Sequence, residues 1–514
     1  MLINPKYQKN PTFNKSLSSP SEVTCGKKSG ALGNTTKCQV GNTPKKAKIT
    51  TENNEISRRN QIYKLQNISA DTLKGELFRD RPARVCSCCK VRSDKNKPIS
   101  IKYDESREKA SYGNLIKCGS VWTCPVCARS VSEVRRDELL KVAEAWKFSN
   151  VFDVINAKDF ARLDLEANKH KLKNKIYLVT FTVRHSRDDS LDDLRKGLIQ
   201  AFNKLNGNTA GRKLWADFGK VFHIRGLEVT WGYANGWHPH FHVLVLSAYE
   251  HTDDELADFK TSIGKEWQKC CVQSGLKKPT IEHGVDVRNG DYASSYINKF
   301  GEEIQCRGMG DKIDLEMTKS HMKHARDKHR FSPFQMLENM DDVPMLRHKF
   351  IEYSHSFFGQ AQLAYSHAKR MKGLAGLLDL TDEDIVNQEK QEQVEMFTVN
   401  KCLFDILYIN RLRGEFLANI ERDIKKDGLQ SDFTYTNDFI KCVVGIVVPK
   451  LETAIEKTPV ENVERLRKIQ ERIFSCVHIL QNPVRLLESE ADHIANLWDV
   501  VEGGAGGNDL PNYL

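Results

Sequence analysis

The sequence predicts an α+β protein. Its centre is a ferredoxin-like split β-α-β domain with an antiparallel sheet, preceded by a zinc-ribbon-like segment and followed by a mostly helical C-terminal region. Three observations predict this. Strand-like and helix-like patterns follow the order β-α-β-β-α-β within residues 170–305. Cysteines cluster within residues 61–150, and residues 346–500 alternate helical patterns with short breaks.

Positive charge is concentrated at the N-terminus. The 514-residue chain has a net charge of +10, and residues 1–60 carry eleven Lys and Arg against three Asp and Glu. This segment is rich in Asn, Ser, Thr and Lys, so we expect a disordered basic arm. Such an arm indicates an acidic polymer partner, most simply nucleic acid, and a solvated tail without a partner is the alternative. No apolar run is long enough for a membrane span, and no signal pattern predicts secretion.

The fourteen cysteines point to a metal site rather than to a disulfide scaffold. Two C-x₂-C pairs can supply four thiolates for tetrahedral zinc: Cys86, Cys89, Cys124 and Cys127. The very polar segment between the pairs is expected to be an inserted loop. Cys88 or Cys118 could take the place of one member, and free thiols are the alternative to a structural zinc.

The split β-α-β domain follows from local patterns. Strands are expected over residues 175–183, 220–231, 238–247 and 281–288, and helices over residues 190–205, 252–271 and 290–300. The capping box from Thr252 to Glu255 marks the start of the second helix. The predicted sheet has two helices on one face and leaves its second face open for a ligand.

The stretch GWHPHFHVLVLS places three histidines at alternate positions, His238, His240 and His242. In a strand these side chains share one face. A hairpin folded at Asn235 pairs residue 228 with residue 242, which puts Glu228 on the same face. Imidazoles and a carboxylate suit Mn²⁺ or Mg²⁺, and also Zn²⁺ or Co²⁺. We expect His240 and His242 as ligands, with His238 or Glu228 as the third.

A second constellation lies in DYASSYINKF, directly after the last expected strand. In a helix, Tyr292, Tyr296 and Lys299 fall on one stripe. A tyrosine hydroxyl needs activation to act as a nucleophile, and a metal that polarises a phosphate provides it. Two core tyrosines beside a solvated lysine are the alternative.

Taken together, these residues resemble the HUH-type rolling-circle replication initiator proteins (Rep) of bacterial plasmids. HUH denotes two histidines that flank a bulky apolar residue, here His240-Phe241-His242. LVTFTVRH resembles the family's first motif, GWHPHFHVLVL its metal-binding second motif, and YASSYINKF its third, which carries the nucleophilic tyrosine. The resemblance covers residues 84–390.

The resemblance implies specific roles. Residues 170–305 would be the HUH endonuclease domain, in which Tyr296 attacks the scissile phosphate and leaves a 5′-phosphotyrosine, and Lys299 is the motif lysine. Some plasmid initiators carry a glutamate where this chain has Tyr292. In this respect the chain is similar to the gene A proteins of single-stranded-DNA phages, which have two tyrosines four residues apart. The departure favours two alternating nucleophiles over a hydrolytic termination.

The implied protein is a site-specific DNA endonuclease and strand transferase of the bacterial cytoplasm. Its cofactors would be Mg²⁺ or Mn²⁺ at the HUH site and a structural Zn²⁺. Its partners would be origin DNA, single-stranded at the nick site, and a host helicase and polymerase. The remaining chain would be a helical extension of the Rep-like region, a helical C-terminal region and a flexible tail, at residues 306–390, 391–500 and 501–514.

Three other functions remain open from the sequence. A two-tyrosine HUH transposase uses the same chemistry. A non-enzymatic zinc-ribbon nucleic-acid-binding protein would need neither the histidines nor the tyrosines. A metal-dependent hydrolase that does not act on DNA would have to manage without a carboxylate-rich second site.

Overall fold

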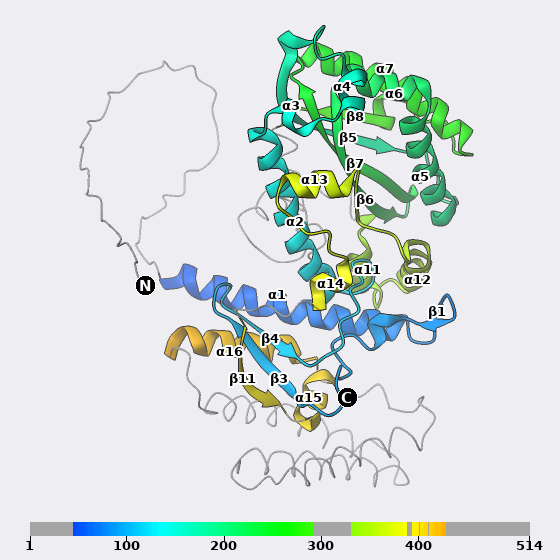
Figure 1. The fold of residues 1–514 in the computed structure, drawn as a ribbon. Helices are drawn as coiled ribbons and strands as arrows, with labels where there is room; N and C mark the ends of the chain where they lie inside the picture. The colour runs from blue at the N-terminus through cyan, green and yellow to red at the C-terminus, as the bar shows by residue number, and fades with distance from the viewer. Residues whose placement is uncertain (1–44, 291–329, 388–392, 400, 410, 428–514) are drawn as a thin grey trace, which may run out of the picture. The chain divides into compact units, whose positions relative to one another are not determined.

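The computed structural model describes residues 45–290, 330–387, 393–399, 401–409 and 411–427 (Figure 1). The chain separates into two compact units, Met1–Ile49 and Thr50–Leu514. The contacts reported below lie within the second unit. Among the predicted segments, the three catalytic candidates Tyr292, Tyr296 and Lys299 and the tail at 501–514 fall outside the described residues.

Within the described residues the main sheet has six strands: β5 (Leu172–Thr182), β6 (Lys220–Gly232), β7 (Gly236–Tyr249), β8 (Val285–Arg288), β9 (Arg330–Phe331) and β10 (Leu363–Tyr365). The strand order is β10-β6-β7-β5-β8, and β9 pairs with β6. Every pairing is antiparallel. The predicted α+β class with an antiparallel sheet is therefore confirmed, and the four expected strands lie side by side in the order β8-β5-β7-β6.

One face of this sheet is covered by the two expected helices, α5 (Leu191–Gly207) and α7 (Asp253–Gln273). The predicted capping box at the start of α7 is present, with Thr252 and Glu255 bonded reciprocally to each other's backbone. Aromatic contacts join the layers, because the ring of Phe181 on β5 lies 5.7 Å from that of Phe202 on α5 and 4.9 Å from that of Trp267 on α7. The shorter helices α6 (Thr209–Asp217) and α8 (Ile281–Gly284) complete this layer.

The second face of the sheet was predicted to be open for a ligand. The structure corrects this, because part of that face is covered. Helices α2 (Pro125–Phe148) and α13 (Ala368–Leu374) cover the part where Leu178, Ile224 and Leu244 form an apolar core with Trp146 and Met371. The reason is physical, since these side chains share one face of the sheet and need burial. The polar part of the same face, which carries the histidines, lies beyond this core.

A second sheet has the order β11-β3-β4, with β3 at Ile99–Asp104, β4 at Lys109–Gly113 and β11 at Gln393–Val399. Two predictions are corrected here. The polar segment between the cysteine pairs was expected to be a loop but forms the β3–β4 hairpin, because Ile99, Ile101 and Tyr103 alternate at strand spacing and are buried. The C-terminal region was expected to be helical from residue 391 but begins with strand β11, which pairs with β3.

Helices accompany this second sheet. Helix α1 (Lys45–Thr72) begins inside the segment predicted to be disordered, so residues 45–60 of the arm are helical. The polar composition of the arm did not suggest this helix, but its C-terminal half is held by packing, because Ile62 and Leu65 are buried. Helices α15 (Lys401–Ile409) and α16 (Arg413–Asp427) follow β11.

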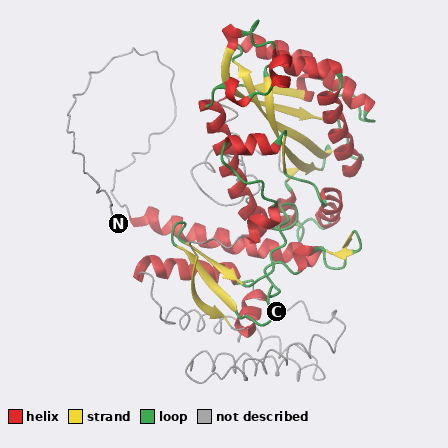
Figure 2. Cartoon of the chain, in the orientation of Figure 1, coloured by secondary structure: helices red, strands yellow, loops and turns green. Residues whose placement is uncertain are grey.

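The remaining elements are short (Figure 2). They are β1 (Leu77–Phe78), β2 (Arg81–Pro82), η1 (Arg84–Cys86), α3 (Val151–Val154), α4 (Ala157–Leu163), η2 (Lys169–Lys171), α11 (Pro333–Asn339), α12 (Met345–Phe357) and α14 (Asp382–Asn387). The extension predicted as helical at 306–390 thus also contributes strands β9 and β10 to the main sheet. None of the helices in the described ranges has a long enough apolar stretch to cross a lipid bilayer.

Candidate metal centres and their surroundings

The register of the β6–β7 hairpin differs from the prediction by two residues. Glu228 pairs with His240 instead of His242, and Thr230 pairs with His238. The turn is centred on Ala234 rather than on Asn235, because the last pair joins Gly232 to Gly236. A shift of two residues keeps every side chain on its predicted face, whereas a shift of one would have exchanged the faces. Glu228 therefore still lies beside the histidines.

Three ligand atoms converge on this face. The Nε2 atoms of His240 and His242 are 3.1 Å apart, and they lie 3.4 Å and 3.3 Å from Oε2 of Glu228. Three ligands about 2.1 Å from one metal ion are separated by about 3.0 Å in octahedral and about 3.4 Å in tetrahedral geometry. The three residues thus have the spacing of a metal triad, and their partial exposure leaves positions for a substrate.

The hydrogen bonds of the two rings favour metal binding through Nε2. Nδ1 of His240 lies 3.3 Å from the backbone oxygen of His238, which can only accept, so Nδ1 carries the proton. Nδ1 of His242 lies 3.0 Å from the hydroxyl of Thr180, which can accept in the same way. In a neutral imidazole with its proton on Nδ1, Nε2 carries the lone pair that can bind a metal. Thr180 was not singled out in the sequence, although its even position on β5 pairs it directly with His242.

The carboxylate is ready for the same role. Burial alone would raise the pKa of Glu228, but its polar contacts with the rings of His240 and His242 outweigh burial and hold the pKa well below its ordinary value. Glu228 is therefore an anion at neutral pH. Two neutral imidazoles and one carboxylate are ligands that Mn²⁺, Mg²⁺ and Zn²⁺ accept.

His238 does not join this group, although the sequence left it open as third ligand. Its Nδ1 atom lies 2.7 Å from Nε2 of His185, and Nδ1 of His185 lies 2.8 Å from the backbone oxygen of Asn235. Burial, followed by the charge of His240, lowers the pKa of His238 to about 3. The structure thus brings Glu228 rather than His238 to His240 and His242. His185 was missed, although it ends the stretch LVTFTVRH.

The strand that leads to the predicted tyrosines also passes this site. Asp286 on β8 pairs with Thr180, and Thr180 pairs with His242. The described chain continues to Gly290, so the tyrosine segment begins five residues after Asp286. In the sequence, the predicted nucleophiles Tyr292 and Tyr296 therefore come shortly after β8. Strand β8 pairs with β5, which carries Thr180 beside His242.

A second cluster consists of the buried residues Cys88, Cys118, Cys124 and Cys127, whose sulfur atoms all lie within 4.8 Å of one another. Sγ of Cys88 is 3.6 Å from that of Cys124 and 3.5 Å from that of Cys127, and Cys118 is 3.7 Å from Cys127. A regular tetrahedron with Zn–S bonds of about 2.3 Å has S···S edges of about 3.8 Å. The cluster therefore fits one tetrahedral metal ion such as zinc.

The membership of this cluster corrects the predicted cysteine set. Cys124 and Cys127 belong to it, but Cys86 and Cys89 do not, and Cys88 and Cys118 stand in their place. The reason lies in the backbone. The thiol of Cys86, at the end of η1, donates to the backbone oxygen of Ala70 on α1, and Cys89 has a φ of +51°, so the turn directs Cys88 inward.

Backbone amides support the sulfur atoms. The amide of Cys118 donates to Sγ of Cys88, and the amide of Ser120 donates to Sγ of Cys118. Burial raises the pKa of Cys124, while hydrogen bonds from the other thiols, Cys118 first, lower the pKa of Cys127. A bound dication would stabilise all four as thiolates, and the amide donors would share their charge.

Comparison with known proteins gives partial likenesses. The chain is 28% identical over 272 residues to a protein named "Protein rep" from Streptomyces lividans, an alignment that covers 45% of this chain and 54% of that protein. It is 28% identical over 156 residues to a "Neomycin resistance protein" from Streptomyces cyanogenus, covering 26% of this chain and 30% of that protein. The chain thus spans about half the length, or less, of these relatives. No family model and no solved structure matches the chain.

Proposed function

We propose that this chain is a Rep-type replication initiator of the HUH class, which nicks and rejoins origin DNA through a 5′-phosphotyrosine. The convergence of Glu228, His240 and His242, with both Nε2 lone pairs directed at one point, carries this proposal. The likeness to a protein named "Protein rep" supports it independently.

The surroundings of the triad suit a phosphodiester. A divalent metal bound there would supply positive charge to the scissile phosphate and to the oxygen that leaves it. The triad offers three protein ligands from one face, which leaves coordination positions for phosphate oxygens. Arg330 on β9 lies within electrostatic reach of His185 and His238 beside the triad and can contact a neighbouring phosphate.

In the proposed reaction, the hydroxyl oxygen of Tyr296 forms a bond to phosphorus and the bond from phosphorus to the 3′-oxygen breaks. The hydroxyl of Tyr296 gives up its proton as this bond forms, and the 3′-oxygen takes up a proton and becomes a free 3′-hydroxyl, which primes synthesis by a polymerase. Lys299 is placed by the motif to offset negative charge on the phosphate. No nucleotide is consumed, because the phosphotyrosine bond replaces the phosphodiester bond one for one.

Termination uses the second tyrosine in this proposal. Tyr292 attacks the regenerated junction, and the waiting 3′-hydroxyl then attacks a phosphotyrosine to rejoin the strand. The cysteine cluster and the basic arm would contact the flanking DNA through its phosphates. A helicase that unwinds the template is the host partner that such a cycle requires.

The test uses single-stranded oligonucleotides that tile candidate origins, each labelled at either end, with Mn²⁺ or Mg²⁺. We expect the 5′-labelled strand to give a shorter free product and the 3′-labelled strand to migrate with the protein on a denaturing gel. A metal-dependent hydrolase would release both fragments free of protein, and a non-enzymatic binding protein would cleave neither. Either result across all oligonucleotides would contradict the proposal.

A further inference from the structure

Strand β6 carries three basic side chains on the face of the sheet that α5 and α6 cover. These residues are Lys220, His223 and Arg225. His223 pairs with Val245 and Arg225 with Val243, whose side chains belong to the core beneath α5 and α7. His223 and Arg225 are partly exposed, so they lie at the margin of this core rather than within it.

The guanidinium of Arg225 is held in place by aromatic rings. Its central carbon lies 4.4 Å from the ring centre of Phe241 on β7 and 5.6 Å from that of Phe202 on α5. Its N–H groups have no hydrogen-bond or ion-pair partner among the described residues, and its nitrogen atoms are not enclosed by the protein. A planar guanidinium fixed on rings, with donors at its edge, matches the oxygens of a phosphate group.

His223 and Lys220 belong to the same cluster. Burial, followed by the positive charges of Lys220 and Arg225, lowers the pKa of His223 well below its ordinary value. Lys220 is only 9% exposed, and its ammonium lies 4.0 Å from the ring of Trp215 on α6 and donates to the side-chain oxygen of Asn206. We call Lys220, His223 and Arg225 the β6 basic cluster.

No carboxylate among the described residues forms an ion pair with this cluster. Burial and then the charge of Arg162 lower the pKa of Lys220, and burial alone lowers that of Arg225. Asp159 on α4 lies beside Arg162, but it pairs with Arg162 at 3.3 Å and with Arg370 at 2.9 Å. The charge of this carboxylate is therefore already balanced, and the described chain gives the β6 basic cluster no counter-ion.

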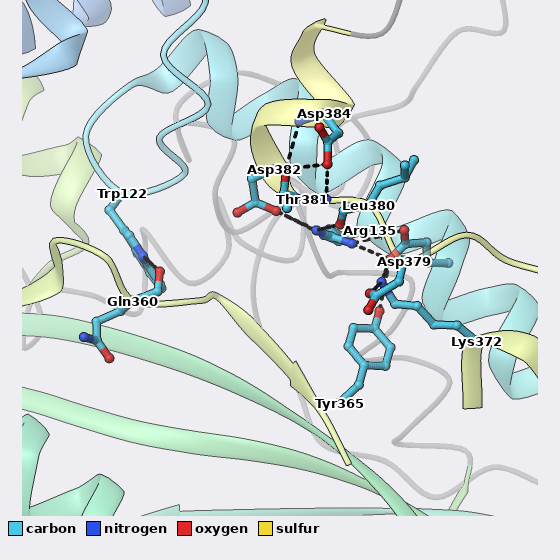
Figure 3. A network of polar contacts seen from close by, with 11 residues as sticks. Trp122, Arg135, Gln360, Tyr365, Lys372, Asp379, Leu380, Thr381, Asp382 and Asp384 are labelled. Atoms are coloured by element: carbon cyan, nitrogen blue, oxygen red, sulfur yellow. Dashed lines mark hydrogen bonds and ion pairs between the residues drawn. The ribbon is translucent and has the colours of Figure 1, made fainter. Parts of the chain in front are cut away.

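Cations on the other face of the sheet show the more usual arrangement. Figure 3 shows Arg135 in contact with Asp382, and Lys372 in contact with Asp379. Removing a cation from water is costly unless an acidic partner or a ligand compensates for it. The fold supplies such partners to Arg135 and Lys372 but not to the β6 basic cluster. The cluster is therefore suited to an anion from outside the described chain.

This anion is not the phosphate that the metal triad would hold. Successive side chains of a strand point to opposite faces, so Arg225 and Glu228, three residues apart on β6, lie on opposite faces of the sheet. One phosphate cannot contact both. The donors of Arg225 are open at the surface, which suits a phosphate in a polymer held at several points better than a free anion held at one.

We propose that the β6 basic cluster binds a phosphate group of the DNA backbone that flanks the scissile site, with Arg225 as the residue in direct contact. The guanidinium donates to two oxygens of this phosphate. The bound anion also favours the charged forms of Lys220 and His223. Such a contact fixes the position of the DNA without reading its sequence. The inference rests on the function proposed above, because that function makes origin DNA the partner.

The test measures the salt dependence of DNA binding with the full chain. Fluorescence anisotropy gives the Kd for a labelled duplex over a range of NaCl concentrations, without Mg²⁺ or Mn²⁺ so that the DNA stays intact. Each phosphate contact contributes about 0.9 to the slope of log Kd against log [NaCl]. We expect Arg225→Gln to lower this slope by about 0.9, equally for duplexes of different sequence. An unchanged slope would overturn the inference.

Two further variants separate the phosphate contact from packing and from net charge. Arg225→Lys keeps the positive charge and should hold the slope within about 0.3 of wild type. Arg129→Gln removes the same charge from α2, where Arg129 pairs with Glu133 at 3.2 Å, and should leave the slope unchanged. A loss in Arg225→Lys as large as in Arg225→Gln, or an equal loss in Arg129→Gln, would overturn the inference.

Free phosphate is the other source of the same chemistry. Inorganic phosphate, added at constant ionic strength, should compete with the duplex no better than chloride does. Competition by phosphate that disappears in Arg225→Gln would show a site for a free anion and overturn the assignment to DNA. Failure of the proposed function is seen separately, as absence of nicking by wild type that still shows the expected difference in slope from Arg225→Gln.

Discussion

His240 and His242 lie two residues apart on β7, and their Nε2 atoms are 3.1 Å apart. A strand normally separates such side chains by more than this, and both rings turn toward Glu228 on β6. We propose that this convergence binds a divalent metal for DNA cleavage.

Loss of either histidine of the triad should weaken metal binding. We expect His240→Ala or His242→Ala to raise the Kd for Mn²⁺ by about 100-fold or more. Thr180→Val should raise this Kd by about tenfold, because the hydroxyl of Thr180 orients the ring of His242. Isothermal titration calorimetry measures both. His238→Ala is the control and should change the Kd by less than about threefold, because His238 pairs with His185 instead. A loss in His238→Ala as large as in His240→Ala would contradict the assignment of Glu228 as third ligand.

Zinc content should distinguish the cysteines. Cys88→Ser or Cys118→Ser removes one of four thiolates and should lower bound zinc from one ion per chain to well below one half, measured by atomic emission after dialysis. Cys86→Ser should retain full zinc, because its thiol faces Ala70 on α1. Loss of zinc in Cys86→Ser, with full zinc in Cys88→Ser and Cys118→Ser, would contradict this cluster. It would favour the set predicted from the two C-x₂-C pairs instead.

Sequence patterns predicted the residues of the two ligand clusters in part, but not all of the partners that the structure gives them. The period of two in HPHFH predicted that the histidines share one face. The predicted register of the β6–β7 hairpin was wrong by two residues, and a shift of two leaves each side chain on the same face. The choice of Cys88 over Cys86 depends on a turn with positive φ at Cys89, which spacing alone does not reveal. His185 escaped notice because its role arises only from its contact with His238, which lies on a segment distant in the sequence.

For the fold, the sequence predicted local elements but not the contacts between distant segments. Alternation of apolar residues identified β5 to β8, and the capping signal at Thr252 located α7. Strand β11 joins β3 across almost three hundred residues, and no local pattern indicates such a pairing. The same holds for α2, whose cover of the second face is a tertiary contact.

The capping box of α7 should make stability depend on acid pH. A hydrogen bond from Lys171, followed by one from the backbone of Thr252, lowers the pKa of Glu255 from 4.5 to about 2. A depressed carboxyl pKa stabilises the fold fully above pH 4.5, and this contribution is lost as the pH falls from 4.5 toward 2. Because Glu255 is one-third exposed, screening limits the contribution to about 1 kcal/mol. Urea unfolding of Glu255→Gln should show a smaller stability loss over this range than wild type, and equal losses would contradict this.

Arg413 should be essential for the stability of the part of the chain that contains α1 and the cysteine cluster. It is fully buried, and its guanidinium donates to the backbone oxygen of Cys89 and to the side chains of Gln66 and Asn67 on α1. Arg413→Met leaves these acceptors unsatisfied and should reduce the free energy of unfolding by about 3 kcal/mol or more. Tryptophan fluorescence in urea measures it.

The exposed neighbour Arg411 provides the control for that variant. Arg411→Met should change the free energy of unfolding by less than about 0.5 kcal/mol. Similar losses in the two variants would show that the buried contacts of Arg413 are not the cause.

The most direct test of the central claim locates the covalent bond. The adduct formed with an origin oligonucleotide and Mn²⁺ is digested with nuclease and trypsin, and tandem mass spectrometry identifies the modified residue. Tyr292 and Tyr296 lie on the same tryptic peptide, residues 289–299, and fragmentation separates them. We predict the nucleotide on Tyr296 in wild type, the same adduct in Tyr292→Phe, and none in His240→Ala. An adduct on a residue outside this peptide, or one that forms undiminished in His240→Ala, would contradict the account.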